Sequence, residues 1–354
     1  IKDLEEFGPS SVLKSGYESA TVSNYYNYID YQHPDWPNWW GPKWIRAGLP
    51  GYTTGSGDLL GGVNYLPDMK TESTETNIGL PVFYANKSDT NADVGDGTTV
   101  REYLVKWITD WVANYGIDSF RCDTAKHVEK ESWLALKNAA KTKLATWKTN
   151  NPTKKIDDSD FWMTGEVWGH GVTKDSYFTD ASFDSLINFG FQSVVASALN
   201  NILSIDSVYS TYATAINNTP DFNVLSYISS HDTKLFFSDY ASLDLNKQKL
   251  AGTLLLLCPG AVQIYYGDEC GRKNGTYSVG DDTQQETRSK MVFSGDPDFN
   301  SDILAHWQKL TQFRKKHKAV GMGNHVKLSM LMPYKFVRIK DTDKVVCVIG
   351  ATGG

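Results

Sequence analysis

One segment of the chain carries charged side chains where a buried strand would be expected to continue. The stretch GIDSFRCDTAKHVE, residues 116–129, holds Arg121 and Asp123 near the end of an apolar run, with Lys126 and His127 just beyond. Side chains of a strand alternate between its two faces, so Arg121 and Asp123 share one face. A neighbouring cation favours an ionised carboxylate and lowers its pKa, which suits a nucleophile. A purely structural Arg–Asp pair is the alternative.

Two further carboxylates follow apolar runs in the same way. Glu166 ends the run in MTGEVWGHG, and Asp232 ends SYISSHD with His231 beside it. The apolar neighbours of Glu166 are expected to raise a carboxyl pKa, which suits a general acid. Three carboxylates in unlike surroundings fit glycoside hydrolysis, in which one acts as nucleophile and another as acid.

The elements that must position these carboxylates alternate between helix and strand. Apolar residues at helical spacing predict a helix from Thr98 to Tyr115, ended by Gly116. Beyond the opening stretch the pattern predicts helices near 130–148, 190–216, 244–257 and 302–317, with strands in FWMTGEV, SFDSLINF, FNVLSYISSHD and GAVQIYYGDE. This alternation predicts an α/β fold with a parallel sheet, and acidic strand ends favour a (β/α)8 TIM barrel. Five strand–helix units are present, which we assign to barrel strands 4–8.

The chain divides into three predicted parts. Residues 1–95 are rich in Gly, Pro, Asn and Trp and show little periodicity, so they are predicted to form a loop-rich inserted domain. Residues 96–320 form the second part of the barrel. Alternating residues in 321–354 predict the start of a C-terminal β-rich domain. The glycine-rich stretch TTGSGDLLGG lacks the spacing of a phosphate-binding loop and is interpreted as a loop.

Composition excludes several partners. A formal net charge of -6 provides no basic face for nucleic acid. No apolar run reaches the roughly 18 residues that a membrane span needs. The 11 Trp and 19 Tyr fit either sugar stacking or core packing. The 4 Cys, at 122, 258, 270 and 347, form no C-x-x-C pair and are predicted to be separate buried thiols, with a disulfide left open.

Several of these stretches resemble a known family in their order along the chain. GIDSFRCDTAKH, GEVWG, YISSHD and PGAVQIYYGDE resemble four signature regions of glycoside hydrolase family 13, the α-amylase family, and YLPDMKTES resembles a fifth. The matching regions run from about residue 64 to residue 270. The resemblance implies an endo-acting α-amylase that cleaves α-1,4-glucosidic bonds of starch or maltodextrins with retention of configuration.

The resemblance also implies residue roles. Asp123 would form the covalent glycosyl-enzyme, Glu166 would act as acid and then base, and Asp232 would stabilise the oxocarbenium-like transition state. The two working carboxyls would lie roughly 5–5.5 Å apart. The remaining substrate-binding residues implied are Arg121, Lys126, His127 and His231.

A structural calcium ion and a compartment are also implied by the resemblance. The positions matching calcium ligands are Asp68 and the main-chain carbonyl of His127, and oxygen donors suit Ca²⁺. Likeness to periplasmic bacterial members implies a periplasmic or secreted protein. We expect a monomer.

The chain departs from the family pattern at two points. Cys122 stands where Val or Ile is usual. The first signature region, which supplies a sugar contact and a calcium ligand, is not found, so we expect the chain to be a segment of a longer protein that is inactive on starch alone. Transglycosylase or α-glucosidase activity, or a non-catalytic carbohydrate-binding role, are the alternatives.

Overall fold

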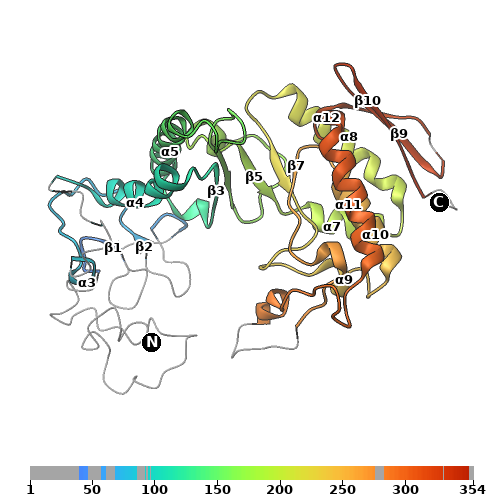
Figure 1. The fold of residues 1–354 in the computed structure, drawn as a ribbon, viewed down its shortest axis with the longest axis horizontal. Helices are drawn as coiled ribbons and strands as arrows, with labels where there is room; N and C mark the ends of the chain where they lie inside the picture. The colour runs from blue at the N-terminus through green and yellow to red at the C-terminus, as the bar shows by residue number, and fades with distance from the viewer. Residues whose placement is uncertain are drawn as a thin grey trace. The chain divides into compact units, whose positions relative to one another are not determined.

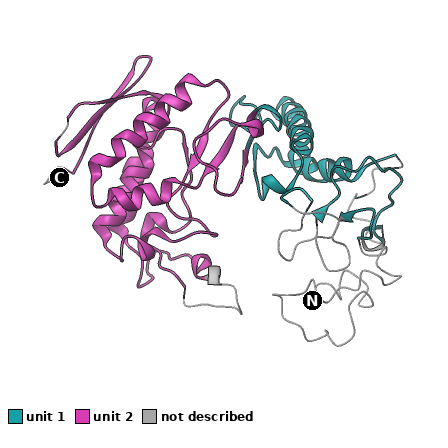
Figure 2. Ribbon diagram, turned by 180° about the vertical axis from the view of Figure 1, so that it is seen from behind, with its two compact units in different colours: residues 1–163, 179–183 teal, residues 164–178, 184–354 magenta. Residues whose placement is uncertain are grey.

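The computed structural model shows the chain as two compact units. It describes residues 40–46, 57–60, 68–85, 92, 95, 97–275, 283–329 and 331–350. The first unit comprises residues 1–163 and 179–183, and the second unit comprises residues 164–178 and 184–354 (Figure 2). Figure 1 labels the elements along the chain, and each unit is described by itself.

The first unit contains two long helices and short strands. A two-stranded antiparallel ribbon pairs β1 (Ile45–Arg46) with β2 (Asp68–Met69). The other elements are α3 (Val82–Ala85), α4 (Val100–Tyr115), β3 (Ser119–Cys122), the 3-10 turn η3 (Ala125–His127) and α5 (Lys130–Asn150). The helices α4 and α5 pack together along the unit (Figure 1). The strand β4 (Trp162–Gly165) begins in this unit, where the Trp162 amide donates to the Asp118 carbonyl (2.9 Å).

Local sequence sets both ends of α4. Thr99 and Glu102 form a reciprocal capping box, which satisfies backbone amides that have no partner inside the helix. At the other end Gly116 adopts a left-handed conformation with φ of 68°, and a Cβ there would overlap the Trp147 ring. The predicted helix and its glycine stop are therefore confirmed, because both depend on neighbouring residues alone.

Aromatic residues form much of the core of the first unit. The Trp44 ring stacks on Trp107 with centroids 5.6 Å apart and packs against Tyr103 at 5.1 Å. The Trp44 indole nitrogen also donates to the Gly79 carbonyl (2.9 Å), so its polar atom is satisfied where the ring is buried. Trp44 and Trp107 therefore contribute to core packing.

The second unit is built on parallel strands in sequential order. Strands β4, β5 (Ser185–Asn188), β6 (Val224–Ser226) and β7 (Ala261–Val262) pair in parallel, and β3 is the neighbour of β4 in the same five-stranded sheet. The helices and 3-10 turns between and after them are α6 (Ser176–Thr179), α7 (Phe191–Ala198), η4 (Ile202–Ser204), α8 (Ile205–Asn218), α9 (Phe236–Asp239), α10 (Leu245–Leu256), η5 (Asp268–Cys270), η6 (Thr283–Arg288), α11 (Ser301–Lys316) and α12 (Lys318–Met322). The predicted α/β alternation with a parallel sheet is confirmed.

Two predicted elements differ from those observed. The continuous helix predicted over 190–216 is wrong, because α7 ends at Ala198 and α8 begins at Ile205. Asn201 between them is extended, with φ of -151°, and asparagine side chains favour such breaks by competing for backbone hydrogen bonds. The strand predicted in GAVQIYYGDE covers only Ala261–Val262, and the chain then turns at Gly267 with φ of 91°.

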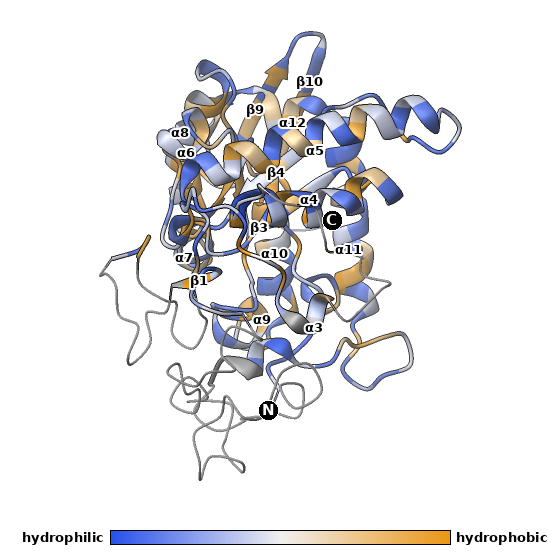
Figure 3. Ribbon diagram, turned by 90° about the vertical axis from the view of Figure 1, so that its left-hand side faces the viewer, coloured by the Kyte–Doolittle hydropathy of each residue, from blue (hydrophilic) through white to orange (hydrophobic). Residues whose placement is uncertain are grey.

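Helices of the second unit bury their apolar faces in one core. Tyr209, Leu254, Leu255 and Trp307 are fully or almost fully buried in this cluster. The helix ribbons carry both hydrophobic and hydrophilic stretches, as amphipathic packing requires (Figure 3). Helices α10 and α11 lie side by side (Figure 1), and the Trp307 indole packs so closely on Gly252 that a Cβ there would overlap it.

A C-terminal antiparallel sheet completes the second unit. Strands β8 (Asn324–Lys327), β9 (Tyr334–Lys340) and β10 (Asp343–Ile349) pair in the order β10-β9-β8. Side chains of β9 alternate between buried and accessible, as the two-residue pattern predicted. The boundaries predicted at residues 95 and 320 stay predictions.

All four cysteines are buried and free, which confirms the prediction of separate thiols. Burial raises the pKa of the Cys122 thiol to about 12. Among the described helices, none is both long and apolar enough to cross a membrane.

A buried polar cluster joins the C-terminal sheet to α8. The His325 Nε2 lies 2.9 Å from Asp206 Oδ1, which also accepts from the Tyr334 hydroxyl (2.8 Å). The Arg338 Nε donates to His325 Nδ1 (3.1 Å), so Nδ1 is an acceptor and Nε2 carries the proton. A second proton on this ring would point at the guanidinium. Burial, with Arg338 and Lys327 nearby, lowers the pKa of His325 despite the Asp206 carboxylate.

We predict that this cluster makes stability depend on pH. The pKa of His325 is below its usual 6.5 in the folded state. The contribution of the neutral ring to the free energy of unfolding is therefore complete above pH 6.5 and is lost as pH falls through the folded-state pKa. In His325→Gln the amide can replace both hydrogen bonds without titrating. Urea unfolding between pH 7.5 and 5 should show a shallower loss of unfolding free energy for the variant. Equal slopes in the two proteins would contradict the prediction.

Candidate active site

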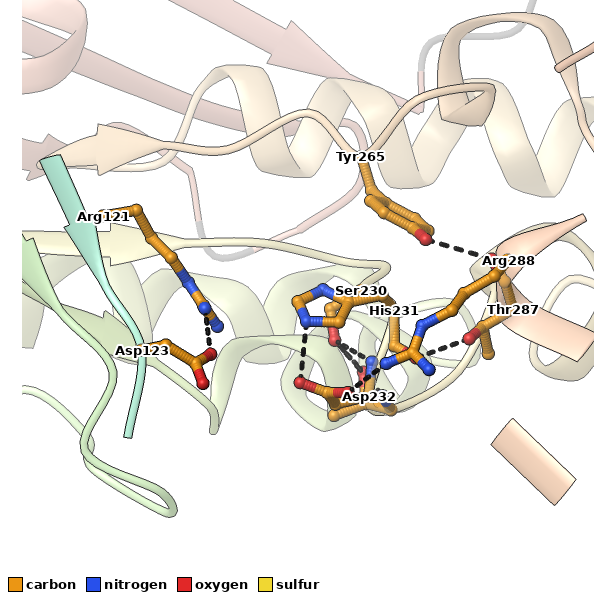
Figure 4. Close-up of polar contacts among 9 residues, drawn as sticks. Arg121, Asp123, Ser230, His231, Asp232, Tyr265, Thr287 and Arg288 are labelled. Carbon is orange, nitrogen blue, oxygen red and sulfur yellow. Dashed lines mark hydrogen bonds and ion pairs between the residues drawn. The ribbon is translucent and has the colours of Figure 1, made fainter. Parts of the chain in front are cut away.

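The nucleophile candidate lies at the carboxyl end of β3. Along this strand Ser119 and Arg121 are exposed while Cys122 is buried, so the predicted alternation of faces is confirmed. Arg121 Nη1 and Asp123 Oδ1 form an ion pair (Figure 4), and the Asp123 side chain is 59% exposed. The next residue, Thr124, is left-handed with φ of 46°, which turns the chain sharply into η3. Asp123 is therefore accessible and held by its predicted partner.

Lys126 and His127 are both anchored to one residue that the sequence reading did not single out. The Lys126 Nζ lies 3.3 Å from Asp58 Oδ1, and His127 Nδ1 lies 2.8 Å from the Asp58 carbonyl oxygen. Asp58 belongs to the glycine-rich stretch interpreted as a loop. Its acidic side chain was the available signal, but the partners lie almost 70 positions further along the chain, so sequence spacing could not connect them.

Asp68 and His127 line the same pocket of about 250 Å³ in the first unit. The segment after β2 is tied to the start of α5, because the Thr71 hydroxyl donates to Glu129 Oε2 (2.5 Å). Arg101 reinforces this link by donating to the Thr71 carbonyl (3.0 Å). The two residues predicted to supply oxygen donors thus line one pocket, and the calcium site stays a prediction. Within the described ranges, no group of three or more His, Cys, Asp or Glu side chains is arranged to hold a metal ion.

The acid–base candidate Glu166 follows β4 directly. Its side chain is buried, with 6% of the residue exposed. Of the expected apolar neighbours, Met163 on β4 is fully buried, whereas Trp168 is half exposed and packs on Phe189 at 4.9 Å. The apolar surround of the Glu166 carboxyl stays a prediction, as does the role of Glu166 as general acid.

Asp232 is held from two sides in the loop after β6. His231 Nε2 lies 2.9 Å from Asp232 Oδ2, and Arg288 Nη2 lies 2.8 Å from Oδ1 (Figure 4). The Thr287 hydroxyl donates to the His231 carbonyl (2.5 Å). Sequence reasoning found His231 because it is adjacent, and missed Arg288 because that residue is 56 positions away.

Asp268, in the stretch GAVQIYYGDE, lies in the interior. It is 5% exposed and accepts from the Ser229 hydroxyl (2.5 Å), which itself accepts from the Phe236 amide (2.9 Å). Gln248 Nε2 donates to the Asp268 carbonyl (2.9 Å). Burial raises the pKa of Asp268 to about 7. This carboxyl supports the loop that leads to Asp232 and is not at the accessible rim.

The three carboxylates are divided between the units. Asp123 belongs to the first unit, whereas Glu166 and Asp232 belong to the second. Each follows the carboxyl end of a strand, at β3, β4 and β6. The separation expected for a retaining pair stays a prediction.

The comparisons with known proteins identify the family. Residues 69–298 match the family model "Alpha amylase, catalytic domain", which is well over half of the chain and includes all three carboxylates. The chain belongs to the α-amylase family. Its parallel strands β3–β7 are five strands of that family's (β/α)8 barrel.

Relatives of known name are α-amylases and related enzymes. The chain is 45% identical over 329 residues to the periplasmic α-amylase of Escherichia coli K12, covering 93% of this chain and 46% of that protein. It is 24% identical to the maltogenic α-amylase of Bacillus acidopullulyticus, covering 66% of this chain and 36% of the relative. The chain thus spans less than half the length of these curated relatives.

Solved structures agree on the fold. The α-amylase from Geobacillus thermoleovorans matches with a TM-score of 0.61 at 21% identity, covering 90% of this chain and 63% of that one. A cyclomaltodextrinase matches with a TM-score of 0.59 at 22% identity, covering 87% of this chain and 46% of that one.

We predict that Asp268 costs stability as pH rises. The folded-state pKa of Asp268 is about 7, and its ordinary value is 3.8. The contribution of the protonated carboxyl to the free energy of unfolding is therefore complete below pH 3.8 and is lost as pH rises through 7. Asp268→Asn keeps an acceptor for Ser229 without ionising. Unfolding free energy, measured from pH 5 to 8.5, should decline less for the variant. Asp244→Asn, at the exposed N-cap of α10, is the control and should match wild type. A wild-type slope in Asp268→Asn would refute this account.

Proposed function

We propose that the protein containing this chain is an endo-acting α-amylase that hydrolyses α-1,4-glucosidic bonds of starch and maltodextrins with retention. The observation that carries the proposal is the accessible Asp123 paired with Arg121 at the end of β3, inside the family match. The name of the Escherichia coli relative supports the same substrate class.

Asp123 is assigned the nucleophilic step. Its carboxylate attacks the anomeric carbon while the glycosidic C–O bond breaks, which forms a covalent glycosyl-enzyme. Arg121 orients one of its oxygens, so the other oxygen is available for attack. Lys126 and His127 follow in the turn η3, and their contacts with Asp58 fix the backbone of a loop assigned to sugar binding.

Glu166 is assigned the proton transfers. In the first step it protonates the leaving glycosidic oxygen, and in the second it removes a proton from the attacking water. The Glu166 carboxyl is buried, with 6% of the residue exposed.

Asp232 is assigned to stabilise the positive charge that develops on the sugar ring. Contacts to both of its oxygens, from His231 and Arg288, fix its orientation. A fixed negative charge requires no reorganisation as the oxocarbenium-like transition state forms. His231 is assigned in addition to bind sugar hydroxyls.

We predict that Asp123→Asn in the complete natural sequence loses activity without losing binding. Nucleophilic attack is abolished, so kcat for reducing-sugar release from maltodextrin should fall by at least about 10³-fold, an order typical of lost catalytic groups. Asp160→Asn, an exposed acidic residue paired with Lys141, is the matched control and should retain wild-type kcat.

The same experiment separates the alternatives. A transglycosylase or α-glucosidase would also lose turnover, but its wild-type products would be longer oligosaccharides or glucose. Retained affinity for maltodextrin without wild-type turnover would indicate a non-catalytic binding protein and would overturn the proposal.

We also propose a structural Ca²⁺ ion held by Asp68 and the main-chain carbonyl of His127, with other oxygen donors. Support comes from the pocket that both residues line. Six to eight oxygens suit this ion, and a carboxylate with a carbonyl is a usual pair among them. Its contribution would be to link β2 to the turn that follows Asp123. A periplasmic location, by likeness to the Escherichia coli relative, and a monomeric state complete the proposal.

We predict that Ca²⁺ raises the melting temperature and that Asp68→Asn reduces the rise. A ligand that binds only the folded state stabilises it by mass action, so loss of one charged donor weakens the effect. Calorimetry measures the melting temperatures of wild type and Asp68→Asn, each with calcium and with a chelator. Equal melting temperatures for wild type in both conditions would refute the calcium site and leave the catalytic proposal standing.

A further inference from the structure

A buried arginine lies behind the residues that contact Asp232. Arg272 follows η5 and is only 3% exposed. Its guanidinium carbon lies 3.9 Å from the centre of the Tyr266 ring and 5.1 Å from that of Tyr265. Such stacking holds the plane of the guanidinium in one orientation.

The guanidinium donates hydrogen bonds to the main chain on both sides of Arg288. Arg272 Nη1 donates to the carbonyls of Thr287 and Ser289, each at 3.1 Å, and Nη2 donates again to Thr287 (3.2 Å). The Ser289 hydroxyl oxygen also accepts from Nη1 (2.6 Å). The fork geometry of arginine can hold two carbonyls two residues apart, which a lysine ammonium on a flexible stem cannot reproduce.

Two tyrosines reinforce the same segment. The Tyr265 hydroxyl donates to the Thr287 carbonyl (3.1 Å; Figure 4), and the Tyr266 hydroxyl donates to the Ser289 carbonyl (2.8 Å). Arg272 Nε donates back to the Tyr266 carbonyl (2.8 Å). Gly267 makes room for this arrangement, because a Cβ there would overlap the Arg272 side chain.

The segment held in this way carries two contacts to the Asp232 loop. Arg288 bonds the Asp232 carboxylate, and the Thr287 hydroxyl bonds the carbonyl of His231, the other partner of that carboxylate. Both contacts come from side chains whose backbone Arg272 holds. A shift of this segment would therefore move both supports of Asp232 together.

We propose that Arg272 is a positioning residue for Asp232, acting through the 287–289 segment and chiefly through Arg288. The proposal rests on the proposed function, because Asp232 is there assigned to transition-state stabilisation. Arg272 contacts neither Asp232 nor substrate in this scheme. Its effect is on the geometry of a group that must be fixed before the reaction begins.

A partly buried arginine provides a matched control. Arg314 in α11 donates to the carbonyls of Leu256 (3.0 Å) and Cys258 (2.7 Å) and also to Gly260. It performs the same kind of main-chain anchoring at the opposite end of β7, away from Asp232. If the loss of kcat in Arg272→Lys came only from losing a main-chain anchor, Arg314→Lys should lose kcat equally. If it came from losing the position of Asp232, Arg314→Lys should keep its kcat.

The test is a double-mutant cycle in the complete natural sequence, with maltodextrin as substrate. Arg272→Lys should lower kcat by up to about 100-fold, the loss that a misplacement of about 1 Å can cause, with KM little changed. Arg288→Ala should lower kcat at least as much. Because Arg272 acts chiefly through Arg288, the double variant should lose little more kcat than Arg288→Ala alone. Arg314→Lys should lower the melting temperature and keep wild-type kcat.

Several outcomes would overturn the inference. Additive losses in the double variant, wild-type kcat in a folded Arg272→Lys, or an equal kcat loss in Arg314→Lys would each do so. If Arg272→Lys does not fold, Ser289→Ala removes one acceptor of Arg272 and should give a smaller kcat loss with the same non-additivity. A wild-type protein without hydrolysis would instead refute the proposed function.

Discussion

Parallel pairing of β4 to β7 is the constraint on which the second unit depends. Parallel strands point the same way, so the loops that leave their carboxyl ends emerge at one edge of the sheet. Glu166 and Asp232 follow two of these ends. The strands themselves are short, and most residues of β4, β5 and β6 are buried, which leaves the loops to carry polar groups while helices cover the apolar faces.

Polar groups in the interior are stabilised mainly by hydrogen bonds to the main chain. Arg272 and Arg314 each donate to several backbone carbonyls, and Arg338 donates to the Val320 carbonyl. Removing one partner of such a group leaves a buried charge or dipole unsatisfied, which costs more than the bond itself contributes. These side chains therefore tie main-chain segments to the elements that carry the arginines.

The site residues combine accessible and buried groups in a way that fits their assigned roles. Asp123 is open to solvent and paired with Arg121, whereas Glu166 is buried beside an apolar strand. Environment, more than residue type, distinguishes a nucleophile from an acid when both are carboxylates. Asp268 shows the third possibility, a carboxyl so deeply buried that its function is to support the Asp232 loop.

The sequence by itself determined the features that depend on near neighbours. The cap and stop of α4, the alternation of faces along β3, the Arg121–Asp123 pair and the His231–Asp232 contact all join residues a few positions apart, and the family motifs identified the barrel. Only the tertiary structure decided that Asp58 anchors Lys126 and His127, that Arg288 bonds Asp232, and that Arg272 holds Arg288 in place. Those contacts join residues that are distant in sequence or lie on loops, and their geometry follows from how the intervening helices and strands pack.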